Sequence, residues 1–396
     1  MTRLLIVTTA HVTLEGFLLP YAAHFRAKGW LVDGLARGAT RSAPCQAAFD
    51  RCFDAEWSRS PLDPHGLFGM SGFLRKLVRD GNYDLLHVHT PVAAFITRCA
   101  LRHLPRSGPR IVYTAHGFHF HAGRSWIPNA LFASAERLAG RWTDRLVVIN
   151  QADRQEALRR GIVDASRLRF MPGIGLDLTH YSPASVPAAD VEAVRRAMGL
   201  SAAQALFLMV GEFNPGKRHR DLLMAFAGLE DDSAHLAFAG TGLLEEELRG
   251  WVAKAGLSQR VHFLGFQKDV RPYMLASLAT ILPSEREGLS RSVMESIALG
   301  VPVIGSSARG VRDLLEECGG FQVPVGDSPA LGRAMLRLIR EPHLAQRVGA
   351  LGRSKVERYG LPNLVHIHEQ LYDELLAERR SGSSRRSSLP HSAKLG

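Results

Sequence analysis

Two acidic side chains, Glu287 and Glu295, stand eight positions apart in "SEREGLSRSVMESIALGVPVIG", between a strand-like run and a glycine. If this interval were wholly helical, the two would be about 12 Å apart along the axis, at roughly 1.5 Å per residue. That exceeds the roughly 5 to 9.5 Å of a glycosidase acid pair, so paired hydrolysis is disfavoured. A ligand with a phosphate centre and hydroxyl groups at both ends fits better, because a carboxylate accepts hydrogen bonds from hydroxyls. A nucleotide-sugar has this layout.

The segment after Glu287 predicts a helix over residues 291–299 with Ser290 as its N-cap. Backbone N–H groups at such an N-terminus, preceded by Gly288, suit a phosphate group. The alternative is structural. Arg291 and Glu295 would then form an ordinary i,i+4 surface pair, with Glu287 solvated.

Two further glycine-bounded turns follow strand-like runs and open helices. In "MVGEFNPGKRHRDLLMAFA", Lys217 and Arg218 lie where their charge could offset a diphosphate, although a lysine at a helix start is often merely solvated. In "AGTGLLEEELRGW", Gly240 and Gly242 would let backbone approach a ligand closely.

Histidines cluster in "YTAHGFHFHAG" (His116, His119 and His121) and in "LLHVHTP" (His87 and His89). Neither an H-E-x-x-H motif nor a cysteine partner accompanies them, so we expect no metal site. His116 is instead expected to make polar contacts with a ligand, and the others to be hydrogen-bonded core or surface residues.

Short apolar runs separated by helix-like stretches must position these residues. Runs rich in Val, Ile and Leu that do not alternate with polar residues predict parallel strands covered on both faces by helices. The runs are "RLLIVTT", "WLVDGLA", "LLHVHT", "RIVYTA", "RLVVIN" and "LRFMPG", then "ALFLMVG", "HLAFAG", "VHFLGF", "LATILPS", "VPVIGS" and "FQVPV". Two such sets predict two doubly wound α/β domains, with ligands beyond the carboxyl ends of the strands in a cleft between them.

The segment rich in Pro, Ala and Ser after residue 173 predicts a linker followed by a helix. We therefore expect a first Rossmann-like domain over residues 1–183 and a second over 184–361. A C-terminal helix over 362–380 is expected to cross back to the first domain. A basic tail over 381–396 is expected to be disordered, because it has too few apolar residues to fold.

The chain has 396 residues, a net charge of +11 and an ordinary globular composition. No apolar run approaches the roughly 20 residues that cross a bilayer, so the sequence predicts a cytoplasmic protein. Four scattered cysteines without a C-x-x-C pair indicate reduced thiols.

The excess of basic residues lies in the first half of the chain. Such a surface suits an anionic partner, or is simply solvated. The segment "GLFGMSGFLRKLVRD" suggests peripheral docking on the anionic inner membrane face, or alternatively an amphipathic core helix. A nucleic-acid partner is not expected, because interleaved aromatic residues and a recognition motif are missing from the sequence.

Taken together, these features resemble glycosyltransferase family 4, from about residue 3 to residue 378. "LPSEREG" and "ESIALGVPVIG" resemble the family's E-x7-E signature and its flanking frame. "YTAHGFHFHAG", "WTDRLVVINQAD", "FMPGIGLD" and "VGEFNPGKRH" resemble its bacterial exopolysaccharide and capsule branch. The resemblance implies a GT-B fold and sugar transfer, with retention of configuration, from a nucleotide-sugar, expected to be a UDP-sugar. It also implies a lipid-linked or saccharide acceptor.

The resemblance assigns Glu287 to the donor sugar, Glu295 to the ribose and Lys217 to the diphosphate. The implied catalytic residues are Glu287, His116 and Lys217. The implied donor-binding residues are Glu295, Gly211, Arg218, Gly240, Gly242, Gly265, Phe266, Gly288, Leu289, Ser290 and Arg291, with the base near Gly265 and Phe266. The implied acceptor-side residues are Thr13, Gly16 and His89.

Two positions depart from the family pattern. Glu212 stands where many relatives have an arginine, which leaves Arg218 and Arg291 as candidates for the second diphosphate cation. "TTAHVTLEG" replaces a double-glycine loop after the first strand. Because the sequence contains no D-x-D, we expect metal-independent transfer without a cofactor. A sugar-nucleotide epimerase and a non-catalytic nucleotide-sugar-binding or membrane scaffold protein are the competing interpretations.

Overall fold

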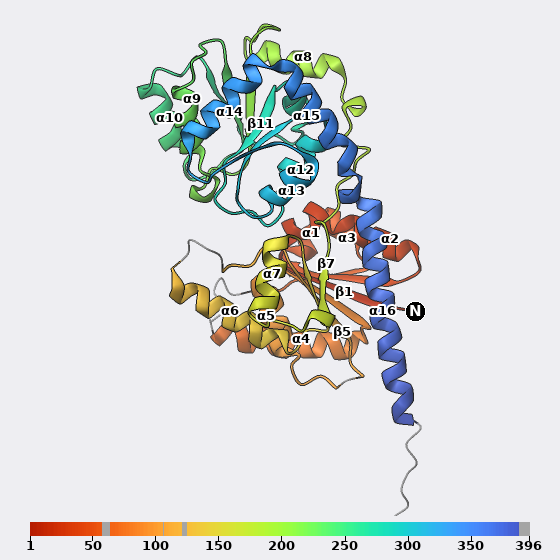
Figure 1. Cartoon of the computed structure of the whole chain (residues 1–396). Coiled ribbons are helices and arrows are strands. Elements are labelled where there is room, and N and C mark those ends of the chain that lie inside the picture. The colour runs from red at the N-terminus through yellow and green to blue at the C-terminus, as the bar shows by residue number, and fades with distance from the viewer. Residues whose placement is uncertain (58–63, 106, 121–124, 388–396) are drawn as a thin grey trace, which may run out of the picture. The chain divides into compact units, whose positions relative to one another are not determined.

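The computed structural model describes residues 1–57, 64–105, 107–120 and 125–387 (Figure 1). Its internal contacts divide the chain into two units, Met1–Ile174 with Leu364–Gly396, and Gly175–Asn363. The first boundary falls before the predicted one at residues 183/184. The linker joins the second unit because Leu176 exchanges backbone hydrogen bonds of 2.8 Å with residues 359 and 361.

The strands form one parallel sheet in each unit. In the first unit they are β1 (Arg3–Ala10), β2 (Leu31–Arg37), β3 (Arg51–Phe53), β4 (Leu85–His89), β5 (Arg110–Ala115), β6 (Arg145–Val148) and β7 (Leu168–Phe170). In the second unit they are β8 (Leu206–Val210), β9 (His235–Ala239), β10 (Val261–Phe263), β11 (Ala279–Leu282), β12 (Val303–Ser306) and β13 (Phe321–Val323).

The sheets have the orders β3-β2-β1-β4-β5-β6-β7 and β10-β9-β8-β11-β12-β13. All of their strand pairs are parallel, as the unbroken apolar runs predict. The sequence missed only β3, a three-residue strand that begins with an arginine. In each sheet the order reverses beside the unit's first strand, which creates a switch point between β1 and β4 and another between β8 and β11.

Helices cover both faces of each sheet (Figure 1). In the first unit they are α1 (His11–Phe17), α2 (Leu19–Ala27), η1 (Ala39–Arg41), α3 (Ala43–Ala48), α4 (Pro64–Gly81), α5 (Pro91–Ala100), α6 (Trp126–Gly140), α7 (Gln151–Arg159) and η2 (Ala165–Arg167). In the second unit they are η3 (Pro183–Ser185), α8 (Ala188–Ala197), η4 (Pro215–Lys217), α9 (His219–Ala227), α10 (Glu245–Lys254), α11 (Arg271–Leu275), α12 (Arg291–Ala298), α13 (Val311–Cys318), α14 (Ser328–Arg340), α15 (Pro342–Lys355) and η5 (Val356–Tyr359).

The last helix, α16 (Leu361–Ser387), begins in the second unit and packs on the first. Its Tyr372 hydroxyl lies 2.5 Å from Nδ1 of His87, and its Glu369 accepts a 2.6 Å hydrogen bond from Lys28. The helix runs through residues 381–387, where the sequence predicts disorder. The remainder of the predicted tail lies outside the described residues.

Helix α4 contains the segment considered for membrane docking. Its Met70, Leu74 and Val78 recur every fourth residue and are buried in the first unit's core. An amphipathic helix that packs one apolar stripe inward has this pattern. The described part of the segment therefore fits the core-helix alternative. No helix within the described residues combines the length and apolarity that a membrane span requires.

Candidate functional site

The predicted donor-binding residues gather at the carboxyl edge of the second sheet, around the switch point between β8 and β11. Lys217 lies in the turn after β8, and Glu287 lies in the loop after β11. The Lys217 ammonium donates a 2.7 Å hydrogen bond to Oε1 of Glu287. The two side chains are only 22% and 14% exposed. The solvated alternative is therefore wrong for both residues, because each is a partly buried member of one ion pair.

A capping interaction holds the turn that carries Lys217. Asn214 is the N-cap of η4, and its side-chain oxygen accepts a 3.2 Å hydrogen bond from the Lys217 backbone N–H. The carbonyl of Gly216 accepts a 2.9 Å hydrogen bond from the backbone of Glu285. The turn after β8 is thus joined by backbone to the loop after β11, which fixes the base of the Lys217–Glu287 pair.

Glu295 lies in α12 with its side chain only 8% exposed. Its Oε1 accepts a 2.8 Å hydrogen bond from Nε of Arg291, so the predicted i,i+4 pair exists. It is not a surface pair, because the Glu295 carboxylate is buried. Burial raises the pKa of Glu295, and the contacts with Tyr181 and Arg291 oppose that shift. Burial and the same carboxylate raise the pKa of Tyr181 to about 12.

Ser290 occupies the predicted N-cap position of α12, but its side chain makes no capping hydrogen bond. Its hydroxyl lies 3.2 Å from that of Ser292 instead. Leu289 packs against the second unit's core. Gly288 approaches Gly310 so closely that a Cβ on Gly310 would lie 2.2 Å from the Gly288 carbonyl oxygen. The loop before α12 is therefore held by packing, while the Ser290 side chain does not cap the helix N–H groups.

Four of the predicted glycines take part in close backbone contacts at this edge: Gly211, Gly240, Gly242 and Gly265. A Cβ on Gly240 would lie 2.0 Å from the carbonyl oxygen of Gly211, and a Cβ on Gly242 would lie 2.6 Å from that of Phe213. Gly240 also donates a 2.8 Å backbone hydrogen bond to Gly265. These glycines let the loops after β8, β9 and β10 pack side by side.

Phe266 and Arg218 lie at the margins of this edge. The Phe266 side chain follows Gly265 and is 77% exposed. Arg218 adopts a left-handed backbone conformation with φ 56°, which non-glycine residues rarely do. Its guanidinium pairs with Asp221 and lies 3.9 Å from Glu285. Arg218 is thus already engaged with Asp221, which weakens its candidacy as the second diphosphate cation.

The predicted residues of the first unit lie at the carboxyl edge of its own sheet. His89 ends β4 and His116 follows β5, with Nδ1 of His89 3.0 Å from Nε2 of His116. Burial lowers the pKa of His116 to about 4 and that of His89 well below its usual range. Both rings are therefore neutral at neutral pH, and each can donate from one nitrogen and accept at the other.

The remaining histidines of this group are structural or lie outside the described residues. His87 is buried between the Tyr372 hydroxyl and the Thr114 hydroxyl, at 2.5 and 2.7 Å. His121 is not among the described residues. Within the described ranges, no three His, Cys, Asp or Glu side chains are grouped to hold a metal ion.

Thr13 and Gly16 lie in α1, which begins directly after β1. The stretch "TTAHVTLEG" is therefore the end of a strand and a short helix rather than a loop. A Cβ on Gly16 would meet no atom within 4 Å, so packing does not require glycine there.

Two residues that shape this edge, Asn214 and Tyr181, were not predicted from the sequence. Asn214 could have been found, because Asn-Pro-Gly is a strong turn signal and Asn is a preferred N-cap. Tyr181 could not, since it lies in the linker and reaches Glu295 only through the fold.

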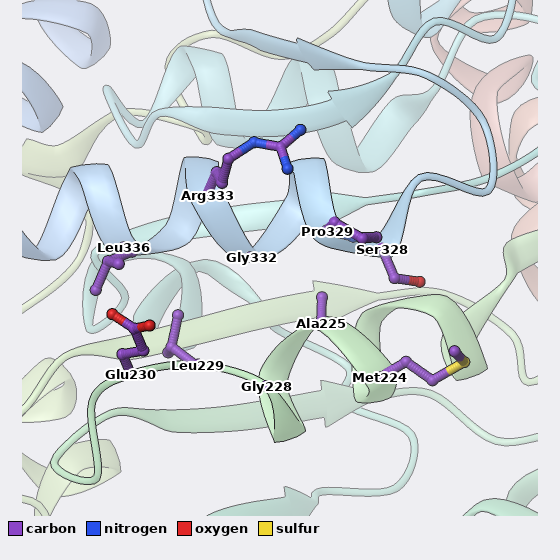
Figure 2. Close-up of a pocket in the computed structure, with 10 residues that line it drawn as sticks. All are labelled: Met224, Ala225, Gly228, Leu229, Glu230, Ser328, Pro329, Gly332, Arg333 and Leu336. Carbon is purple, nitrogen blue, oxygen red and sulfur yellow. The ribbon is translucent and has the colours of Figure 1, made fainter.

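A separate groove of about 420 Å³ lies between α9 and α14 (Figure 2). Small and apolar residues such as Ala225, Leu229 and Gly332 line it, with Glu230 and Arg333 as its charged residues. It contains none of the predicted donor-binding residues, so we do not include it in the candidate site.

Two family models match the chain. The model described as "Glycosyltransferase Family 4" matches residues 14–174, and the one described as "Glycosyl transferases group 1" matches residues 190–355. Together they cover both units.

Curated relatives agree with these models. The chain is 30% identical over 378 residues to the "Putative glycosyltransferase EpsD" of Bacillus subtilis (strain 168), covering 93% of this chain and 96% of the relative. It is 27% identical over 274 residues to "UDP-Gal:alpha-D-GlcNAc-diphosphoundecaprenol alpha-1,3-galactosyltransferase" of Escherichia coli, covering 67% and 68%. Among solved structures, Anabaena Alr3699/HepE in complex with UDP superposes with a TM-score of 0.78 at 21% identity, covering 94% of this chain and 100% of that one.

Proposed function

The chain belongs to glycosyltransferase family 4 and has the GT-B fold, and we propose that it transfers a sugar from a UDP-sugar, with retention of configuration. The proposed acceptor is a lipid-linked or saccharide acceptor in the synthesis of an exopolysaccharide, capsule or other cell-envelope glycan. The named relatives support this choice, since one is a diphosphoundecaprenol galactosyltransferase and a solved neighbour is a UDP complex.

The observation that carries the proposal is the Lys217–Glu287 ion pair at the switch point of the second sheet. In open α/β sheets, ligands bind outside the carboxyl ends of the strands at such a point. A cation and an acid held there by neighbouring loops suit the two parts of a sugar diphosphate. Lys217 offsets the charge of the diphosphate, and Glu287 accepts hydrogen bonds from the sugar hydroxyls.

The proposed reaction breaks the bond between the anomeric carbon and the diphosphate oxygen, and that oxygen keeps the electron pair. Negative charge then grows on the diphosphate, and Lys217 and the N–H groups of the first turn of α12 stabilise it. The acceptor hydroxyl attacks the anomeric carbon from the face that the diphosphate leaves. Its proton passes to an oxygen of the leaving phosphate. No metal ion or other cofactor is required in this scheme.

Glu295 has a different role in the proposal. Its buried carboxylate is fixed by Arg291 and Tyr181, so its orientation is set before a ligand arrives. A fixed acceptor of this kind suits the two hydroxyls of a ribose. In the first unit, Thr13, Gly16 and His89 are proposed for the acceptor side, and the neutral His116 for hydrogen bonds to hydroxyl groups.

The test measures turnover with a panel of UDP-, GDP- and ADP-sugars and an undecaprenyl-diphosphate-linked sugar acceptor. We expect UDP release that depends on acceptor, and a product with the anomeric configuration of the donor. Lys217→Ala should lower turnover at least about tenfold, or about 1.4 kcal/mol of lost charge stabilisation. Lys254→Ala changes an exposed lysine at the end of α10 and should leave turnover unchanged.

Four results would each contradict a part of the proposal. Near-normal turnover in Lys217→Ala removes the role of that lysine. Isomerised sugar without acceptor indicates an epimerase, and nucleotide binding without turnover of any donor indicates a binding protein. A product of inverted configuration refutes retention alone and leaves the transfer intact.

The membrane part of the proposal is separate from the chemistry. A lipid-linked acceptor lies at the inner face of the cytoplasmic membrane. Helix α4 exposes Arg75 and Arg79 on its polar face, beside a Lys76 that is paired with Asp80 at 2.7 Å. Cations near an anionic surface attract it by about 1 kcal/mol each. We expect the protein to sediment with vesicles that contain phosphatidylglycerol and not with neutral ones. Indifference to lipid charge would exclude peripheral docking on an anionic membrane, whatever the outcome of the turnover assay.

A further inference from the structure

A basic region lies at the amino-terminal edge of the first sheet, where β5 begins with Arg110 and β6 begins with Arg145. A groove of about 420 Å³ is found there, between the ends of α5 and α6. Five arginines line it: Arg102, Arg110, Arg141, Arg145 and Arg167. We call this the arginine groove. It lies at the opposite edge of the sheet from His89 and His116, so no residue of the candidate site takes part in it.

Three of the five arginines have carboxylate partners. Arg110 pairs with Asp144 at 3.0 Å and Arg167 with Asp164 at 3.0 Å. Arg145 pairs with Glu374 and Glu378 of α16 at 2.7 and 2.5 Å.

Arg102 and Arg141 pair with no carboxylate among the described residues, and both are exposed. They follow the last turns of α5 and α6, where each helix end carries about half a negative charge. That partial charge offsets them without neutralising them. The arginine groove therefore keeps a positive charge that the chain itself does not balance.

The paired arginines also leave donors unused. Nε of Arg110 and Nε of Arg145 are both buried and have no hydrogen-bond partner in the described structure. The whole Arg145 residue is only 7% exposed. A buried donor of a charged group that lacks an acceptor is costly, at roughly 1 to 3 kcal/mol. These two Nε atoms have almost no accessible surface, so an anion in the groove would meet the exposed guanidiniums instead. It would supply acceptors and charge to Arg102 and Arg141.

We propose that the arginine groove binds a phosphate group, carried either by a phospholipid headgroup or by a free phosphorylated solute. Arginine suits this ligand because its planar guanidinium donates to phosphate oxygens in a fork. The volume lies within the range of small-molecule sites, about 300 to 1,000 Å³. The proposal does not depend on the proposed function, because it uses neither Lys217 nor any residue of the second unit.

The groove offers its own spectroscopic reporter, since Trp142 also lines it. The experiment titrates the full chain with potassium phosphate at constant ionic strength and follows tryptophan fluorescence. A saturable change is expected in the unmodified protein and should disappear in Trp142→Phe. Phosphate bound at the candidate donor site should not change the fluorescence of Trp142, because no donor-binding residue lines the arginine groove.

The double variant Arg102→Gln/Arg141→Gln tests the groove itself. We expect its apparent affinity for phosphate to fall at least about tenfold, because two charge-assisted interactions are lost. The control Arg154→Gln/Arg347→Gln removes two exposed arginines outside the groove and should stay within about twofold, since it changes only long-range charge. All four side chains are exposed, so folding should be preserved.

Sedimentation with phosphatidylcholine vesicles, with and without phosphatidylglycerol, separates the two sources of phosphate. Loss of sedimentation in Arg102→Gln/Arg141→Gln alone identifies a lipid headgroup. Unchanged sedimentation with weakened phosphate binding identifies a free solute. Equal phosphate titrations and equal sedimentation for the double variant, the control and the unmodified protein would overturn the proposal. Turnover at a saturating acceptor concentration should be the same in all three.

Discussion

The two units use one topology to build two different carboxyl edges. At the switch point of the first sheet, the hydroxyls of Thr9 and Thr90 lie 2.7 Å apart and join the ends of β1 and β4. At the equivalent point of the second sheet, Lys217 and Glu287 join the loops after β8 and β11 through an ion pair. The same strand order therefore holds a neutral bridge in one unit and a charged bridge in the other.

The difference extends to the residues around each bridge. Neutral imidazoles of His89 and His116 surround the first, and the carboxylates and cations of the donor-binding set surround the second. Each edge also has a non-glycine residue with positive φ, Thr90 at 62° and Arg218 at 56°. Such conformations cost roughly 1 to 3 kcal/mol and concentrate at functional sites. The fold thus supplies two positions for chemistry, and the loops decide whether each is neutral or charged.

The largest effect is expected when the Lys217–Glu287 ion pair, which distinguishes the second unit from the first, loses its negative charge. Glu287→Gln keeps the shape of the side chain but removes its charge and its pairing with Lys217. We expect turnover to fall about 100-fold, or about 2.7 kcal/mol, as when one preorganised electrostatic partner of a transition state is lost. Glu285→Gln is the matched control, because that acid is exposed and lies no nearer than 3.9 Å to Arg218. Equal losses of turnover in the two variants would show that turnover depends on the total negative charge at this edge and not on the Lys217–Glu287 ion pair.

The fold of both units could be predicted from the sequence, because buried parallel strands leave unbroken apolar runs. Glu287 and Lys217 could each be selected from their local pattern as well. Their pairing could not, since they are far apart in the chain and meet only because β8 and β11 are neighbours. The arginine groove left no signal at all, because its residues come from the ends of several elements that share no motif.

A second prediction concerns the close backbone packing of the charged edge. Gly240→Ala would place a Cβ 2.0 Å from the Gly211 carbonyl oxygen, at a backbone φ of 154° that side chains rarely adopt. We expect the free energy of unfolding to fall by about 2 kcal/mol or more, which urea denaturation measures. Gly250→Ala has the opposite expectation. A Cβ there meets nothing within 4 Å in the interior of α10, so stability should rise by up to about 1 kcal/mol.

The third prediction concerns the buried, neutral histidines of the first unit and the dependence of stability on pH. Burial lowers the pKa of His368, which lies beside His87 and Tyr21, from 6.5 to about 4. Above pH 6.5 the imidazole is neutral in both folded and unfolded chains, so it adds no pH dependence. Between these values the unfolded chain binds a proton that the folded chain excludes, and stability falls as the pH falls.

His368→Gln removes the imidazole that binds this proton in the unfolded chain. We expect the slope of unfolding free energy against pH, between about 6 and 4.5, to become shallower by up to about 1.4 kcal/mol per pH unit. The measurement is a series of urea titrations across this range. His343→Gln changes an exposed histidine of α15 and should leave the slope as it is. An unchanged slope in His368→Gln would mean that this imidazole is already charged in the folded protein.

The smallest expected effect concerns two helix N-cap residues, Asn214 and Ser290. Only the Asn214 side chain makes a capping hydrogen bond. Asn214→Ala removes a side-chain oxygen that accepts from the Lys217 N–H and should cost about 1 kcal/mol of stability. Ser290→Ala removes a hydroxyl that makes no capping bond to α12, so stability should change by less than about 0.5 kcal/mol. A loss of stability in Ser290→Ala equal to that in Asn214→Ala would show that the serine caps the helix in solution, and the charged edge would then have fewer N–H groups for a ligand.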